Sequence, residues 1–231
     1  MAQNERKRQE ALAKKRSKRE QRKRAEKPAL LGSQSAAAVG RWPVHSAWIL
    51  SDWREKLLAV MFIIRQQTNG AYALGSYLVD LGCLGLKNTF AAMNLTWKDV
   101  QEKMQPPARS GSHIVQCDPN LVAKILLTGV EFAEQLGFFP HKDFRDSISM
   151  LQGLDPDACQ EHVSTGKNGK PFYVQGPYDD TARILKRLEA AVGRDGFEFM
   201  YGLGGFAEYT GDEDDYDVDE EDEDSLEPPR W

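Results

Sequence analysis

Apolar runs separated by turn residues define the folded part of the chain. Residues 57–67 and 71–81 are two such runs, and Asn69 and Gly70 lie between them. Asn-Gly between two apolar runs is the strongest short-range signal for a β-hairpin. The pattern therefore predicts a hairpin over these two runs, with a bulge at Gly75 because glycine inside a strand often marks one.

One long helix is predicted after this hairpin. In residues 119–136 the apolar positions recur at spacings of three and four, which is the helical period. Asp118 is a good N-cap before Pro119, and Gly137 is placed to end the helix. Gly129 inside the helix costs about 1 kcal/mol relative to Ala, so we expect it to serve close packing.

Three shorter helices follow from their end signals. Thr96 and Asp99 have the spacing of a capping box and open a helix over residues 96–104, with Asp in place of the usual Glu. Residues 143–151 form the second, and residues 181–192 form the third, which begins after acidic residues suited to a helix N-terminus.

The remaining segments of the body carry weaker patterns. Residues 42–56 contain three tryptophans and are expected to cover the core, whereas residues 105–117 are expected to be a loop. Residues 161–165 and 170–175 flank a glycine-bounded turn and predict a second hairpin. Residues 197–201 predict a final strand.

This mixture of hairpins and helices predicts an α+β fold. We expect a mainly antiparallel sheet built from two β-hairpins and a terminal strand, packed with about four helices. Residues 42–207 are predicted to form a single globular domain. Residues 1–41 are predicted to be a disordered or nascent-helical basic arm and linker, and residues 208–231 a disordered acidic tail.

Charge is concentrated at the two ends of the chain. Residues 1–27 hold twelve Lys or Arg and four Glu, a net charge of about +8. Residues 208–231 hold thirteen Asp or Glu and one Arg, about −12, whereas the whole chain carries −5. A near-neutral body with a basic arm and an acidic tail is typical of proteins that contact polyelectrolytes, nucleic acid above all.

Composition argues against several other classes of protein. No apolar run is long enough to cross a membrane, and the basic arm lacks the apolar stretch of a secretory signal. The three cysteines, Cys83, Cys117 and Cys159, are far apart and are expected to be reduced in a cytoplasmic protein. No motif predicts a cofactor, and no histidine spacing predicts a metal site.

The leading hypothesis is a cytosolic RNA- or ribosome-associated binding protein. The basic arm lacks aromatic residues, so it would contact phosphates and would not read bases. A solubilising tail, or an arm that pairs with the acidic tail, is the simpler alternative. The residues expected to contact nucleic acid are Arg6, Lys7, Arg8, Lys14, Lys15, Arg16, Lys18, Arg19, Arg22, Lys23 and Arg24.

Two other functions stay open. A metal-dependent nuclease or another phosphate-ester hydrolase would use Asp80, His141 and Asp143, provided that their side chains meet in one cleft. Asp143 is better explained as a helix cap than as a catalytic group, and a Cys83–His141 nucleophile pair is less expected than a buried, inert thiol. The third possibility is a protein-interaction module whose acidic tail binds a basic partner.

Four segments of the body form a recognisable set: the hairpin turn with residues 77–88, residues 132–138, residues 140–144, and residues 169–173 with residues 176–180. Together they resemble a family of uncharacterised bacterial proteins, over about residues 42–201. No activity is assigned to that family, so the resemblance implies a single bacterial domain and a shared surface but no functional residue.

Overall fold

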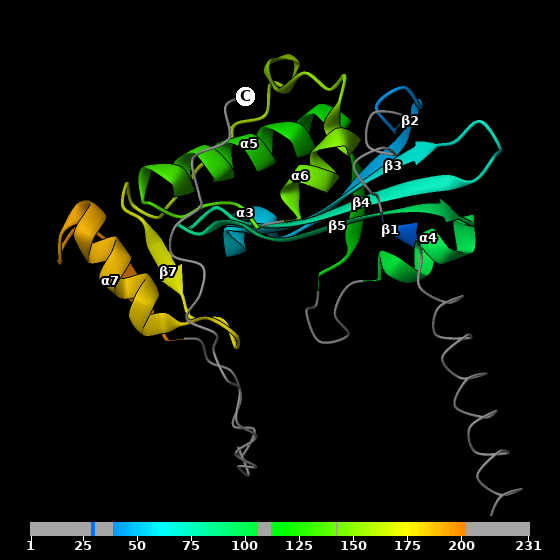
Figure 1. Cartoon of the computed structure of the whole chain (residues 1–231). Helices are drawn as coiled ribbons and strands as arrows, with labels where there is room; N and C mark the ends of the chain where they lie inside the picture. The colour runs from blue at the N-terminus through cyan, green and yellow to red at the C-terminus, as the bar shows by residue number, and fades with distance from the viewer. Residues whose placement is uncertain (1–28, 31–38, 106–111, 142, 202–231) are drawn as a thin grey trace, which may run out of the picture.

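The computed structural model describes residues 29–30, 39–105, 112–141 and 143–201 (Figure 1). Its main element is a six-stranded antiparallel sheet with the strand order β1-β5-β4-β3-β2-β6. The strands are β1 (Ala29–Leu30), β2 (Val44–Leu50), β3 (Leu58–Gln66), β4 (Tyr72–Asp80), β5 (Gly85–Leu95) and β6 (Ile114–Cys117). Five α-helices in the described part of the chain accompany the sheet, so the predicted α+β class is confirmed.

The first predicted hairpin is present as β3 and β4. Gln67 N–H donates to the Ala71 carbonyl at 2.8 Å, and Gly70 adopts φ 83°, which closes the turn. The predicted bulge at Gly75 is wrong, because Gly75 pairs regularly with Ile63 on β3. A Cβ at Gly75 would lie 3.0 Å from Met150 Cγ, so this glycine makes room for a core side chain instead.

Four strands of the sheet lie where no strand was predicted, and one of them is the two-residue β1, which falls within the predicted linker because it pairs with the distant β5. The tryptophan-rich segment does not merely cover the core, since its residues 44–50 form β2 between β3 and β6. The expected loop over 105–117 ends in β6, which pairs with β2 from Ile114 to Cys117. The eleven-residue β5 was also missed, because its sequence, GLKNTFAAMNL, shows no clear alternation of apolar and polar positions.

Helix α5 (Pro119–Gln135) covers one face of the sheet, as predicted (Figure 1). The Asp118 carboxylate caps it by accepting the N–H of Asn120 at 2.9 Å, and Gly137 follows its end with φ 79°. A Cβ at Gly129 would lie 2.5 Å from Val79 Cγ1 on β4, which confirms the packing role of this glycine. The predicted helix over 143–151 is shorter, with α6 (Phe144–Ser147) passing into a 3₁₀ turn, Ile148–Leu151.

The opposite face of the sheet is covered by α4 (Trp97–Lys103). Its capping box is complete, because Thr96 and Asp99 each accept the other's backbone N–H. A smaller apolar cluster that includes Phe62, Ile64 and Val100 joins this helix to the sheet. The sheet therefore carries helices on both faces, and α3 (Trp53–Lys56) lies between β2 and β3 in the chain.

A buried arginine donates hydrogen bonds to the loops at one end of the sheet. Arg65 on β3 is only 2 % exposed, and no carboxylate forms an ion pair with it among the described residues. Its guanidinium donates instead to backbone carbonyls, at 2.9 Å for Met150 and 2.6 Å for Trp42, and also to those of Gly40 and Gln152. Burial lowers its pKa from the ordinary value.

The second predicted hairpin is wrong. Residues 161–165 form no strand, and β7 (Phe172–Val174) pairs in parallel with β8 (Glu198–Met200) in a separate two-stranded sheet. Helix α7 (Thr181–Val192) connects the two strands, as a parallel pair requires a crossover. The helix itself and the final strand were predicted correctly, and we call residues 172–200 the β7–α7–β8 unit.

The β7–α7–β8 unit has its own apolar cluster. Tyr173 and Leu188 are fully buried in it together with Cys83 and Leu136, which come from the main body. The unit lies beside the end of the sheet where β4 turns into β5 (Figure 1). Within the part of the chain that the structure describes, no helix is long and apolar enough to cross a membrane.

Candidate functional site

A cavity of about 760 Å³ lies where the end of the sheet meets the β7–α7–β8 unit. This volume is in the range of cavities that bind small molecules. Its lining comes from four parts of the chain that are distant in sequence: Lys56, Leu57, Leu58, Leu78, Asp80, Gly82, Lys87, Asn88, His141, Phe172, Val174, Gln175, Gly176, Pro177, Tyr178 and Asp179.

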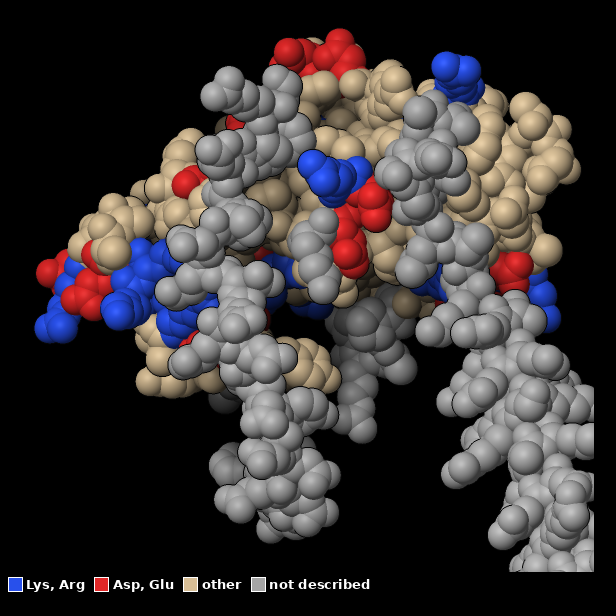
Figure 2. All heavy atoms as spheres, in the orientation of Figure 1, with Lys and Arg blue, Asp and Glu red and all other residues tan. Residues whose placement is uncertain are grey.

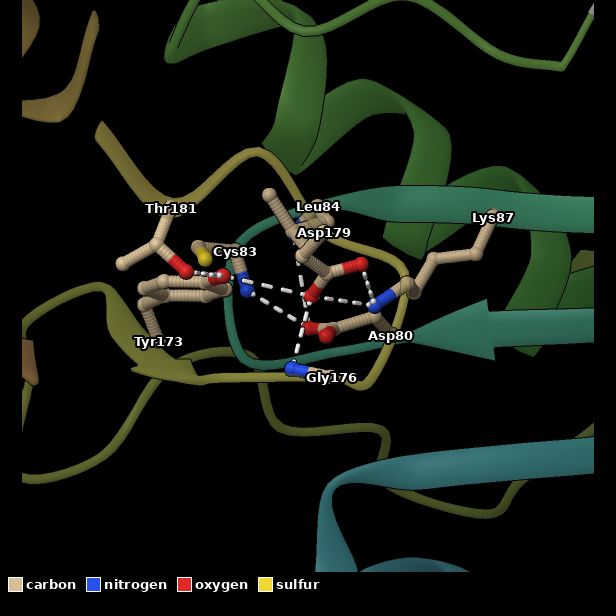
Figure 3. A network of polar contacts seen from close by, with 8 residues as sticks. All are labelled: Asp80, Cys83, Leu84, Lys87, Tyr173, Gly176, Asp179 and Thr181. Carbon is tan, nitrogen blue, oxygen red and sulfur yellow. Dashed lines mark hydrogen bonds and ion pairs between the residues drawn. The ribbon is translucent and has the colours of Figure 1, made fainter. Parts of the chain in front are cut away.

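An ion pair between Lys87 and Asp179 joins the two sides of the cavity. Lys87 Nζ lies 2.8 and 2.9 Å from the two carboxylate oxygens of Asp179 (Figure 3). Asp179 Oδ2 also accepts the Gly176 N–H at 2.9 Å and the Tyr173 hydroxyl at 3.2 Å. Desolvation by itself would raise the pKa of Asp179, but these hydrogen bonds outweigh it and the pKa is lowered.

Asp80, at the end of β4, is the second carboxyl group of the cavity. It is 8 % exposed, and its Oδ1 accepts the backbone N–H groups of Cys83 at 2.9 Å and Leu84 at 3.4 Å. The backbone N–H of Gly82 also stabilises this carboxylate, so the turn after β4 surrounds the Asp80 side chain with backbone donors (Figure 3). Burial raises the pKa of Asp80 even though the backbone hydrogen bonds and the charge of Lys87 oppose the shift.

The two carboxyl groups therefore differ in their preferred protonation state. Asp179 is held as an anion by Lys87, whereas the environment of Asp80 favours the neutral acid relative to an exposed aspartate. Groups with pKa values shifted in opposite directions in one cavity are typical of functional sites, although structural ion-pair networks produce the same shifts. The arrangement can exchange a proton at Asp80 while Asp179 keeps its charge.

The histidine predicted from sequence lies at the same cavity. His141 lines it together with Asp80, so two of the three proposed hydrolase residues share one cleft. Asp143 is absent from the lining, and its carboxylate Oδ2 lies 3.8 Å from His141 Nδ1. Because Nδ1 accepts the Asp143 N–H at 3.3 Å, the Nε2 atom of the imidazole is the one that carries a proton to donate.

The site residues do not fit a metal centre. Across residues 29–30, 39–105, 112–141 and 143–201, no group of three or more His, Cys, Asp or Glu side chains is placed to hold a metal ion. Cys83 is fully buried and its pKa is raised by desolvation, so its thiol is a poor nucleophile and does not pair with His141 at the cavity.

Sequence reasoning missed the residues that connect the two sides of the cavity. Asp179 was expected to serve a helix N-terminus, but Asp180 alone caps α7, by accepting the Arg183 N–H at 3.1 Å. Lys87 and Asp179 are 92 positions apart in the sequence, so no spacing rule could have paired them. The predicted nucleic-acid-binding residues of the arm all lie outside the described residues.

Charge and exposure differ between the cavity and the helix beside it. The cavity is lined by two lysines and two aspartates, a near-neutral set. On α7, Arg183 and Lys186 are exposed and Arg187 is half-buried. Figure 2 shows blue side chains gathered over the α7 end of the molecule. Tyr178, on the loop before α7, is 98 % exposed.

No known protein family, no curated protein and no solved structure matches this chain.

Proposed function

We propose that this protein is a cytosolic RNA- or ribosome-associated binding protein that uses its basic N-terminal arm for phosphate contacts. The observation that carries the proposal is the placement of charge, about +8 within residues 1–27 of a chain whose net charge is −5. Lysines and arginines in such an arm gain affinity for phosphates by releasing counterions.

Features of the folded body support the same function. Basic side chains gather on α7, and an exposed tyrosine and a cavity with an aromatic wall lie next to that helix. Basic side chains interleaved with exposed aromatic rings are typical of surfaces that bind single-stranded nucleic acid.

The test is a salt titration of RNA binding. A labelled single-stranded RNA of about twelve nucleotides, within the usual site size for such proteins, is titrated with the full chain. The comparison is a variant in which the eleven arm residues from Arg6 to Arg24 named above become Gln. If about six phosphates are contacted, the slope of log affinity against log salt should fall by about 4.

A matched control neutralises eleven acidic residues of segment 208–231 and leaves the arm intact. This variant should keep the salt slope of the wild-type chain or steepen it, because it removes charge that competes with phosphate. An arm variant whose affinity and salt slope equal those of the wild type would contradict the proposed function.

Phosphate-ester hydrolysis is the second candidate, because Asp80 and His141 line one cavity. In that reaction the Asp80 carboxylate removes a proton from water, the water oxygen bonds to phosphorus, and the Nε2–H of His141 protonates the leaving oxygen as the ester bond breaks. His141→Gln should then lower RNA hydrolysis about 100-fold, with His113→Gln as a control away from the cavity. Equal rates in both variants, with Mg²⁺ or with EDTA, would exclude this role of His141.

A further inference from the structure

The walls of the cavity suit a flat ring. Phe172 and Tyr178 supply aromatic faces, while Leu58, Leu78 and Val174 supply aliphatic contacts. Tyr178 is almost fully exposed, so its ring is available to close over a bound group. Stacking of a base on an aromatic side chain is favourable for every base, since each presents a π-face.

The charges of the cavity favour a neutral ligand over a phosphate. Lys87 already donates to both oxygens of Asp179, and Lys56 forms an ion pair with Asp52 one helical turn away. With both lysines matched by carboxylates, the site has no excess positive charge with which to hold an anion. A phosphate placed there would also meet Asp80, which would repel it when ionised.

The polar groups of the cavity suit the edge of a base. Asn88 and Gln175 each present an amide that both donates and accepts. The carboxyl group of Asp80 is fixed by backbone N–H groups of the turn that follows β4, two of them on Oδ1, and it lines the cavity as a further polar group. Unstacked bases are read by such groups on their Watson–Crick edges.

We propose that the cavity binds one unpaired base of a single-stranded RNA, while the basic arm holds the phosphates of the same strand. This assignment rests on the proposed RNA-binding function. It assigns phosphate binding to the basic arm and base binding to the cavity. The arm lacks rings to stack on bases, and the cavity lacks spare charge for phosphate, so each supplies what the other does not.

The first described strand after the arm pairs with a strand that also lines the cavity. β1 follows the arm and pairs with β5 at Met93, whereas the cavity is lined by Asn88 of the same strand. Five residues of a β-strand span about 17 Å. An RNA of about twelve nucleotides exceeds that distance comfortably.

Tyr178→Ala tests the stacking contact in the full chain. Because the side chain is 98 % exposed, its removal should leave the body folded. We expect single-stranded RNA of about twelve nucleotides to bind about tenfold more weakly, as for the loss of one stacked base. Tyr178→Phe keeps the ring and should bind like the wild type, and Tyr201→Ala removes an exposed tyrosine that does not line the cavity.

Asp80→Asn tests the polar contact. Asn retains an oxygen for the N–H groups of Cys83 and Leu84 and presents an NH₂ group where Oδ2 stood, so an acceptor becomes a donor. The order of affinity among oligo(A), oligo(C) and oligo(U) should therefore change in this variant. Tyr178→Ala should instead weaken binding of all three oligonucleotides by a similar factor.

The outcomes separate this inference from the function on which it rests. A full chain that binds no RNA, or whose binding ignores the arm, contradicts the proposed function and the cavity assignment with it. If arm-dependent binding is intact but is unchanged by Tyr178→Ala and Asp80→Asn, only the cavity assignment is wrong. Competition by duplex RNA as strong as by single-stranded RNA would also overturn it.

Discussion

The six-stranded sheet and the β7–α7–β8 unit are stabilised in different ways. The sheet is covered by helices on both faces, and its largest apolar cluster includes residues that are completely buried, such as Met61 and Ile125. The unit has a two-stranded sheet and a smaller cluster, and it is tied to the main body by the Lys87–Asp179 ion pair.

The two regions also differ in what they expose. Seven large hydrophobic side chains are exposed among the described residues, and five of them lie at residues 174–201: Val174, Tyr178, Val192, Met200 and Tyr201. Exposed apolar side chains that gather in one region mark interaction sites more often than scattered ones. The comparison teaches that the sheet serves as the scaffold. The cavity and the two carboxyl groups with shifted pKa values lie at its junction with the small unit.

The largest effect is expected from Arg65→Ala in the scaffold. The substitution leaves four backbone carbonyls without their donor at a nearly closed site. We expect the free energy of unfolding to fall by about 3–5 kcal/mol, measured by urea denaturation. Arg54→Ala, which removes an exposed ion pair with Glu161, should cost less than about 1 kcal/mol. If the two variants lost similar free energies of unfolding, the hydrogen bonds of Arg65 would not stabilise the fold more than an exposed ion pair does.

A smaller and local effect is expected from Lys87→Met at the junction. It leaves the Asp179 carboxylate, whose side chain is 11 % exposed, without its cation. The loss should be about 2–3 kcal/mol, and hydrogen exchange should speed up in β7 and β8 before it does in β3 and β4. Uniform acceleration throughout the chain would mean that the small unit is not a separate cooperative region.

The pH dependence of Asp80→Asn should sharpen the comparison further. Burial raises the folded-state pKa of Asp80, so the folded protein binds this proton more tightly than the unfolded chain does. Its stabilising contribution is present below the unfolded pKa of about 3.9 and is lost as the pH rises through the folded pKa. The variant lacks this loss and should gain stability relative to wild type as the pH rises above the unfolded pKa of about 3.9 and through the folded pKa.

Asp99→Asn provides the control of opposite sign for that experiment. Hydrogen bonds from the Thr96 side chain and backbone lower the pKa of Asp99. Stability from Asp99 is therefore present above the unfolded pKa and lost as the pH falls through the folded pKa, so wild type should exceed this variant near neutral pH. Parallel curves for wild type and Asp80→Asn would show that Asp80 has an ordinary pKa.

The smallest effect on stability is expected from Tyr178→Ala. An almost fully exposed side chain makes few contacts, so its truncation should change the free energy of unfolding by less than about 0.5 kcal/mol. Thermal unfolding followed by circular dichroism measures the difference. A clear destabilisation would show that the Tyr178 side chain stabilises the folded body, contrary to its exposure.

Local signals in the sequence predicted the elements that depend on neighbouring residues. The Asn69-Gly70 turn, the caps of α4 and α5 and the end of α7 at Gly193 all follow from backbone conformations that particular residue types favour. The bulge at Gly75 was wrong because glycine serves there to admit Met150, which is 75 positions away in the chain. The parallel pairing of β7 with β8 was missed for the same reason, as α7 separates the two strands.

The candidate site shows the same division. Asp80 and His141 were identifiable as polar residues at the ends of apolar segments, and both line the cavity. Lys87, Tyr173 and Asp179 were not identifiable, because their roles depend on one another across the junction. Asp143 illustrates the converse, since sequence proximity to His141 did not bring it into the cavity lining.

The sequence by itself determined the α+β class, the positions of most helices and the concentration of opposite charges at the two ends of the chain. These properties depend on local conformational preference and on composition, which need no knowledge of contacts. Only the tertiary structure decided the strand order, the place of Arg65 and the meeting of Asp80 with Lys87 and Asp179. Those features arise from packing between distant segments, because burial and pairing depend on what lies nearby in space.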